Sequence, residues 1–126
     1  MTAMLPLLVV LAGGVGAATR FVVDGHVRAR RPGPFPLATF VVNVSGSLAL
    51  GLLTGAALWH GLPREAYAVA GVGFCGGYTT FSTAMVETVR LAQAGDLRRA
   101  GVNALGSLLV TLAAAALGVA LMAATA

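Results

Sequence analysis

The sequence is short of charge, since Asp, Glu, Lys and Arg make up only 10% of its 126 residues and lysine is absent. Soluble domains carry about a quarter charged residues, so this composition argues against a water-soluble enzyme. The single cysteine, Cys75, excludes an internal disulfide and is best interpreted as a small packing residue. Aromatic residues make up only 6% and do not accompany the arginines, so nucleic-acid binding is not supported.

Hydrophobic residues, in contrast, make up 58% of the chain, and the mean hydropathy is +0.90. A membrane-spanning helix needs about 20 apolar residues, so the length accommodates four spans with short links. We therefore predict an all-α membrane protein with four transmembrane helices in one domain, residues 1–126. The apolar stretches place the spans at about 4–23, 37–59, 66–89 and 100–124.

The arginines of the predicted links fall mainly on one side of the membrane. Six lie in the links 24–36 and 90–99, whereas only Arg64 lies in the link on the other side. Because basic loops stay in the cytoplasm, both chain ends are expected to face out.

The third predicted span contains an unusual run, Gly73-Phe-Cys-Gly-Gly-Tyr-Thr-Thr-Phe-Ser-Thr83. A glycine cluster followed by hydroxyl residues favours a helix broken at mid-membrane, whose freed carbonyls need a partner in protein, water or a cation. The alternative is a glycine-lined helix contact in which the hydroxyls bond to their own helix.

Polar residues also recur at four-residue spacing on the second and fourth spans. On the second span, Asn43 lies between Thr39 and Ser47, and its carboxamide either lines a polar path or bridges helices. Ser47 and the glycines that follow it on the same helix face favour close helix packing over a functional role. The fourth span carries Asn103, Ser107 and Thr111, and its segment Asn-Ala-Leu-Gly-Ser-Leu echoes Asn-Val-Ser-Gly-Ser-Leu, which starts at Asn43.

These polar groups suit a small anion. Glu87, near the end of the third span, is the only acid within a predicted span, whereas amide and hydroxyl donors dominate. A pore must replace the anion's hydration shell with several weak donors, because one fixed positive charge would trap the ion. Arg20, near the end of the first span, either snorkels to the interface or serves such a path.

The run Gly73–Thr83 closely resembles the signature of the small bacterial fluoride channels called Fluc or CrcB. The resemblance extends over the whole chain. It includes the segments Gly13–Arg20 and Pro36–Ser47 and the hydroxyl residues spaced by four on the fourth span. The resemblance implies a multi-pass protein of the bacterial plasma (inner) membrane that exports fluoride passively from the cytoplasm.

The resemblance also implies an antiparallel dimer with two pores and one structural sodium ion (Na+) at its centre. Carried over, the backbone carbonyls of Gly76 and Thr79 and their counterparts in a second chain would hold the sodium ion. The residues implied for the fluoride pathway are Arg20, Thr39, Asn43, Phe81, Ser82, Thr83, Ser107 and Thr111. Among them, Phe81 would offer its ring edge and Arg20 would draw anions inward.

Two features depart from the family pattern. Ala84 stands where a second phenylalanine is usual, and Asn103 stands where a tyrosine is common. The six-to-one arginine bias also favours one orientation, whereas an antiparallel homodimer needs both. A heterodimer with an oppositely oriented homologue therefore remains an alternative, as does a non-conducting structural subunit. A proton-coupled drug exporter would need an acid within its first span, where this chain has none before Asp24.

Overall fold

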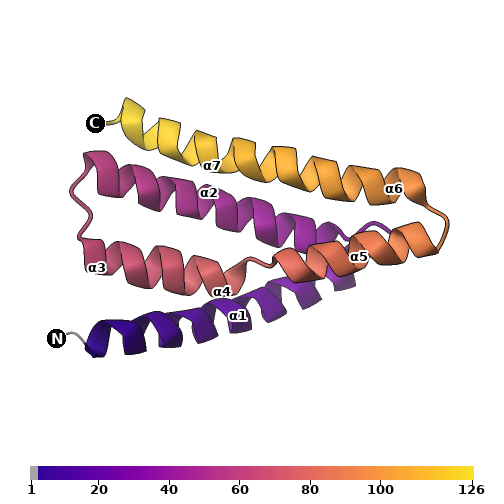
Figure 1. Ribbon diagram of the computed structural model, residues 1–126, viewed down its shortest axis with the longest axis horizontal. Helices are drawn as coiled ribbons and strands as arrows, with labels where there is room; N and C mark the ends of the chain where they lie inside the picture. The colour runs from indigo at the N-terminus through magenta and orange to yellow at the C-terminus, as the bar shows by residue number, and fades with distance from the viewer. Residues whose placement is uncertain (1–2) are drawn as a thin grey trace.

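The computed structural model describes residues 3–126, which form helices and short links and contain no strand. The chain builds four helical rods that lie side by side (Figure 1). The first two rods are α1 (Met4–Arg30) and α2 (Leu37–Trp59). The third combines α3 (Arg64–Tyr67), the π-helical η1 (Ala68–Cys75), α4 (Gly76–Tyr78) and α5 (Phe81–Gln93). The fourth combines α6 (Leu97–Gly101), the π-helical η2 (Val102–Gly106) and α7 (Ser107–Ala124).

Three helical stretches of the described chain are long and apolar enough to cross a membrane: Met4–Arg30, Leu37–Trp59 and Leu97–Ala124. The third predicted span is not among them, because α4 ends at Tyr78 and α5 begins at Phe81. The multi-pass, all-helical class predicted from the sequence is confirmed.

The first helix continues past Val23, where the predicted span ends, to Arg30. Asp24 and Arg28 stabilise this extension with an ion pair of 2.7 Å across one helical turn. Pro32, the first proline of the link, lies just beyond the helix end. The expected link of residues 24–36 is therefore helical in its first half.

The arginine-rich links lie together at one end of the molecule. The turn between α5 and α6 is at the same end as the segment between α1 and α2 (Figure 1). Both chain ends lie at the opposite end, beside the link from α2 to α3. The two arginine-rich links thus lie at the same end of the bundle, as the charge pattern predicts.

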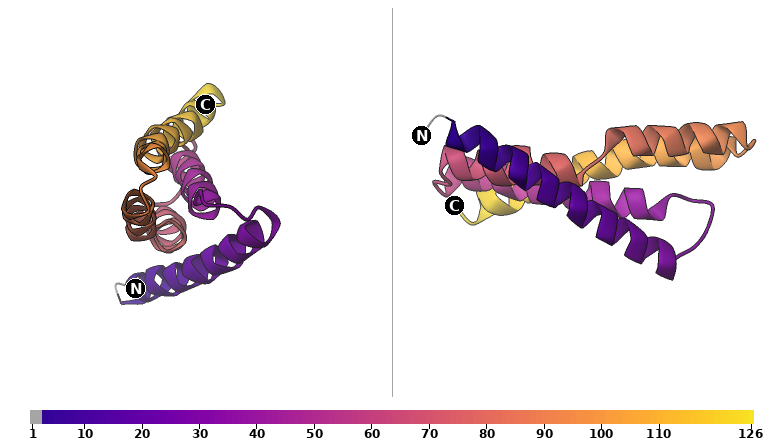
Figure 2. Two further views of the ribbon diagram at one scale, coloured as in Figure 1. Left: turned by 90° about the vertical axis from the view of Figure 1, so that its right-hand side faces the viewer. Right: turned by 90° about the horizontal axis from the view of Figure 1, so that it is seen from below.

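Glycines allow the rods to pack closely. A methyl group at Gly16 would collide with the Phe74 carbonyl, and one at Gly77 would collide with the Gly13 carbonyl, so α1 lies directly against η1 and α4. Similar contacts at Gly51 join α2 to α7 along their length. Two further views show α1 crossing the other rods at an angle (Figure 2).

Large apolar side chains cover the outside of the molecule. Exposed Leu, Val and Met residues are concentrated on α1 and α7, as lipid or another chain would require. The interior is narrow and built from small residues, among them the free thiol of Cys75, which is buried.

Candidate functional site

The site forms where the third rod changes from helix to extended backbone. Thr79 has a ψ of 158° and Thr80 a φ of −148°, so neither residue continues α4. The Thr79 N–H still donates to the Cys75 carbonyl at 2.9 Å. The Thr80 hydroxyl accepts from the Thr83 N–H at 3.3 Å and so caps the N-terminus of α5.

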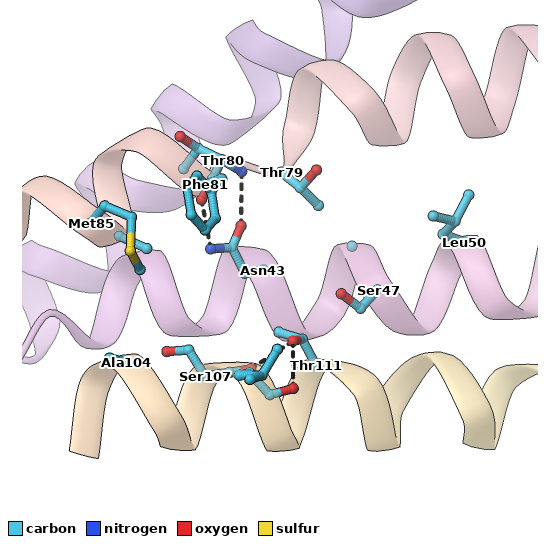
Figure 3. Close-up of a pocket in the computed structure, with 13 residues that line it drawn as sticks. Asn43, Ser47, Leu50, Thr79, Thr80, Phe81, Met85, Ala104, Ser107 and Thr111 are labelled. Atoms are coloured by element: carbon cyan, nitrogen blue, oxygen red, sulfur yellow. Dashed lines mark hydrogen bonds between the residues drawn. The ribbon is translucent and has the colours of Figure 1, made fainter. Parts of the chain in front are cut away.

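Asn43 of α2 holds the extended backbone from the side. Its Nδ2 donates to the Thr80 carbonyl at 2.8 Å, and its Oδ1 accepts from the Thr80 N–H at 2.8 Å (Figure 3). An N–H and a C=O that lost their helical partners are both satisfied by one carboxamide. Because Nδ2 carries two hydrogens, one donor of Asn43 remains for another acceptor.

A cavity of about 280 Å³ opens next to this contact. Asn43 and Phe81 line it from one side and α7 from the other, and the Phe81 ring stands beside the Asn43–Thr80 pair (Figure 3). None of the described residues lining this cavity is acidic or basic. The lining residues are Asn43, Gly46, Ser47, Leu50, Thr79, Thr80, Phe81, Ala84, Met85, Ala104, Ser107, Leu108 and Thr111.

The hydroxyls lining the cavity differ in what they can donate. Thr111 donates to the Ser107 carbonyl of its own helix at 2.6 Å. Within the described residues, the Ser47 and Ser107 hydroxyls make no hydrogen bond. Ser47 and Ser107 can therefore donate to an occupant of the cavity, whereas Thr111 offers lone pairs.

A second cavity, of about 300 Å³, lies on the other side of Thr80, which lines both. Its walls include Arg20, Asp24, Thr39 and Thr83. The guanidinium of Arg20 donates to the Thr79 carbonyl at 3.2 Å and makes no ion pair within the described residues. Arg20 thus turns inward against the third rod, without an ion-pair partner among the described residues.

Glu87 of α5 is bonded at the edge of this cavity. Its Oε1 accepts from Arg28 at 2.9 Å and from the Thr39 hydroxyl at 2.9 Å, whereas its Oε2 is buried without a partner in the described chain. The partner of Glu87 is therefore Arg28 of α1. Glu87 thereby joins α5 to α1 and α2.

The two carbonyls expected to hold sodium differ in their surroundings. Thr80 donates its N–H to Asn43, so the Gly76 carbonyl loses the donor that a continuous helix would supply. Gly76 is exposed, and a side chain there would meet open space. The Thr79 carbonyl, in contrast, already accepts from Arg20.

The predicted site residues divide between the two cavities. Asn43, Phe81, Ser107 and Thr111 line the first. Arg20, Thr39 and Thr83 line the second. Ser82 lines neither, and its hydroxyl lies 3.5 Å from that of Thr80.

Sequence reasoning missed Ser47 and Met85 as cavity residues. Ser47 is four residues after Asn43, a spacing that places both on one helix face. The glycines near it, however, favoured a role in helix packing over a role in the site. Met85 carried no polar signal at all.

Comparison with known proteins assigns the chain to a family. The family model described as "CrcB-like protein, Camphor Resistance (CrcB)" matches residues 7–119. A relative from Leifsonia xyli, named fluoride-specific ion channel FluC 1, is 52% identical over 94% of this chain and 86% of its own length. A relative from Cutibacterium acnes, named fluoride-specific ion channel FluC 2, is 48% identical over 94% of this chain and 97% of its own length. With this match over nearly its whole length, the chain belongs to the CrcB-like protein family.

Proposed function

We propose that this protein is a fluoride-selective channel of the bacterial plasma membrane that lets fluoride leave the cytoplasm passively. The relatives that match most of its length are named fluoride-specific ion channels. The apolar helices account for its place in the membrane as a multi-pass protein. A channel requires a path rather than a nucleophile and a base, so the scarcity of ionisable side chains fits this function.

The observation that carries the proposal is the chemistry of the first cavity. It offers the free N–H of Asn43 and the unbonded hydroxyls of Ser47 and Ser107, with the Phe81 ring edge beside them. A hydrogen bond to a charged group contributes about 1.5–3 kcal/mol, so several such donors offset part of the hydration energy that fluoride loses. No positive charge lines this cavity within the described residues, so an ion can also leave it.

The second cavity is the entrance on the arginine-rich side. The charge of Arg20, free of ion pairs, raises the local concentration of anions there. An anion then passes Thr80, which lines both cavities, toward the donors around Asn43. Thr39 contributes differently from the prediction, because its hydroxyl donates to Glu87 and so cannot donate to fluoride at the same time.

The interruption at Thr79 and Thr80 supports a finer architecture that we also propose. In the proposed channel the third rod is one transmembrane helix broken at these residues, and a second chain packs antiparallel to the first. The exposed face around Gly76 and the 79% exposure of Phe81 support a partner at this surface. A sodium ion at the dimer centre would take the Gly76 and Thr79 carbonyls of each chain, as hard cations prefer oxygen ligands. The Gly76 carbonyl has lost its helical donor, and the Thr79 carbonyl, which accepts from Arg20, keeps a second lone pair for this role.

A second candidate function is a subunit of a heterodimer that conducts through one pore or none. Ala84 is buried and gives the cavity wall a methyl group where the family pattern has an aromatic ring. The two arginine-rich links also lie together at one end, which favours one orientation in the membrane. Under this candidate, the chain alone transports poorly and an oppositely oriented homologue restores the flux.

Fluoride efflux from liposomes that contain the purified chain alone tests the proposal, with chloride as the control anion. Selective fluoride efflux is the expected result, and efflux of neither anion from the folded chain would favour the heterodimer. Ser107→Ala removes a free donor and should slow fluoride efflux about tenfold. The matched variant Thr111→Val removes a hydroxyl that already donates to its own helix, and it should leave efflux within about twofold of the original.

A further inference from the structure

The α5 helix is held by two carboxamides from two other rods. Asn43 on α2 binds Thr80 just before the helix begins. Asn103 on η2 donates its Nδ2 to the Ala84 carbonyl at 3.2 Å and to the Thr88 hydroxyl at 2.8 Å. Thr80 and Ala84 are four residues apart, so the two amides contact α5 about one helical turn from each other.

Asn103 is among the most deeply buried polar side chains of the described chain, with 1% of its surface exposed. A buried amide is costly unless it is bonded, and its Nδ2 satisfies this requirement entirely on α5. The Thr88 hydroxyl donates to the Ala84 carbonyl at 2.8 Å, which leaves its lone pairs to accept from Asn103. The three groups form a small closed network inside the protein.

This network lies on the face of α5 that lines the first cavity. Phe81, Ala84, Met85 and Thr88 recur at spacings of three and four residues, which places them along one side of the helix. The first three of these line the cavity. Since Thr79 and Thr80 are extended, α5 does not inherit its orientation from α4 and must be positioned by its own contacts.

The two asparagines also begin the two similar segments of the sequence. Each is followed four residues later by a serine that lines the cavity, Ser47 after Asn43 and Ser107 after Asn103. The two serines lie on α2 and α7, which pack along each other. The echo between the segments thus has a structural counterpart, in which each supplies one amide to α5 and one hydroxyl to the cavity.

We infer that Asn103 is a positioning residue that, together with Asn43, fixes α5 and thereby sets where Phe81 and Met85 stand in the cavity. Its bonds to Ala84 and Thr88 act on the cavity wall through the helix, without contact to the anion. The effect on transport rests on the proposed function as a fluoride channel, whereas the effect on α5 does not.

Two variants on α5 test this inference with little risk to folding. Thr88→Val removes the hydroxyl that Asn103 contacts and keeps the shape of the side chain, whereas Thr88→Ser keeps the hydroxyl and serves as the matched control. Methyl resonances of ¹³C-labelled methionine in lipid nanodiscs report the position of α5 through Met85. Met122 is an internal reference, because its side chain packs on Gly55 between α2 and α7, away from the network.

In Thr88→Val and in Asn103→Ala, the Met85 resonance is expected to shift or broaden while that of Met122 stays in place. The ratio of fluoride to chloride efflux is expected to fall at least about fivefold, the factor that corresponds to one lost hydrogen bond of about 1 kcal/mol. Thr88→Ser should match the original protein in both readouts. An unchanged Met85 resonance, or an unchanged efflux ratio in a conducting protein, would overturn the inference. If the original chain conducts no fluoride, the proposed function fails, and the Met85 resonance still decides whether Asn103 positions α5.

Discussion

Replacing Asn43 with aspartate is the most specific change that can be made in the cavity. It replaces the amide NH2 group by an oxygen and keeps the shape of the side chain. The carboxylate loses the donor that binds the Thr80 carbonyl at 2.8 Å and places an oxygen against that carbonyl. It also loses the second N–H that faces the cavity. Both changes remove donors at the position where the proposed channel needs them.

The added charge has the largest effect. A fluoride ion about 4 Å from the new carboxylate meets a repulsion of about 4 kcal/mol at an effective dielectric constant of about 20. That energy corresponds to a decrease of about a thousandfold in the rate of passage. The lost hydrogen bond to Thr80 adds about 1 kcal/mol. We therefore expect Asn43→Asp to abolish measurable fluoride efflux from liposomes.

Asn43→Ala is the matched control, because it removes both bonds to Thr80 without adding charge. Leaving the Thr80 N–H and carbonyl unpaired costs about 1–3 kcal/mol, so efflux should fall about ten- to a hundredfold. Gel filtration of both variants checks that they are folded. Efflux by Asn43→Asp within about threefold of the original would refute the assignment of Asn43 to the anion path.

Two further predictions concern the scaffold. Gly77→Ala places a methyl group against the Gly13 carbonyl and should destabilise the fold by about 1–3 kcal/mol in denaturation experiments. Gly76→Ala points into open space and should leave the single chain unaffected; equal destabilisation by both variants would contradict the close contact of α1 with α4. The N–H of Arg99 donates to the Asp96 carboxylate, which caps α6, and thereby lowers the pKa of Asp96. The stability from this cap is thus present at neutral pH and lost as pH falls through the lowered pKa. Asp96→Ala should accordingly lower the melting temperature at about pH 7, by an amount that shrinks as pH falls below the usual pKa of aspartate, about 3.9, and a decrease that does not change with pH would contradict the assignment.

The outline of the fold could be predicted because hydrophobicity and helix breakers determine it. The second helix begins and ends at the predicted residues, Leu37 and Trp59, between a proline-rich link and a glycine turn. The end of the first helix could not be placed, because the charges after Val23 suggested a link. They form an ion pair along the helix instead, and spacing alone does not reveal whether a charged segment stays helical.

The site was predictable in its residue types and less so in their roles. Asn43 was expected either to line a path or to bridge helices. In the structure it does both, because it lines the first cavity and bonds to Thr80 of the third rod. The partners of Thr39 and Arg20 lie 48 and 59 residues away in the chain, on a different rod, so no local pattern indicates them. The difference between Ser107 and Thr111 depends on which rotamer bonds to the backbone, which the sequence does not specify.

The central claim is passive, selective conduction of fluoride. The most direct test is fluoride flux through liposomes containing the purified chain, with potassium and valinomycin setting the membrane potential and no proton gradient. The account predicts a net fluoride flux that follows the imposed potential in both directions and a chloride flux near that of empty liposomes. Fluoride and chloride fluxes of equal size, or a fluoride flux that appears only with a proton gradient, would contradict it.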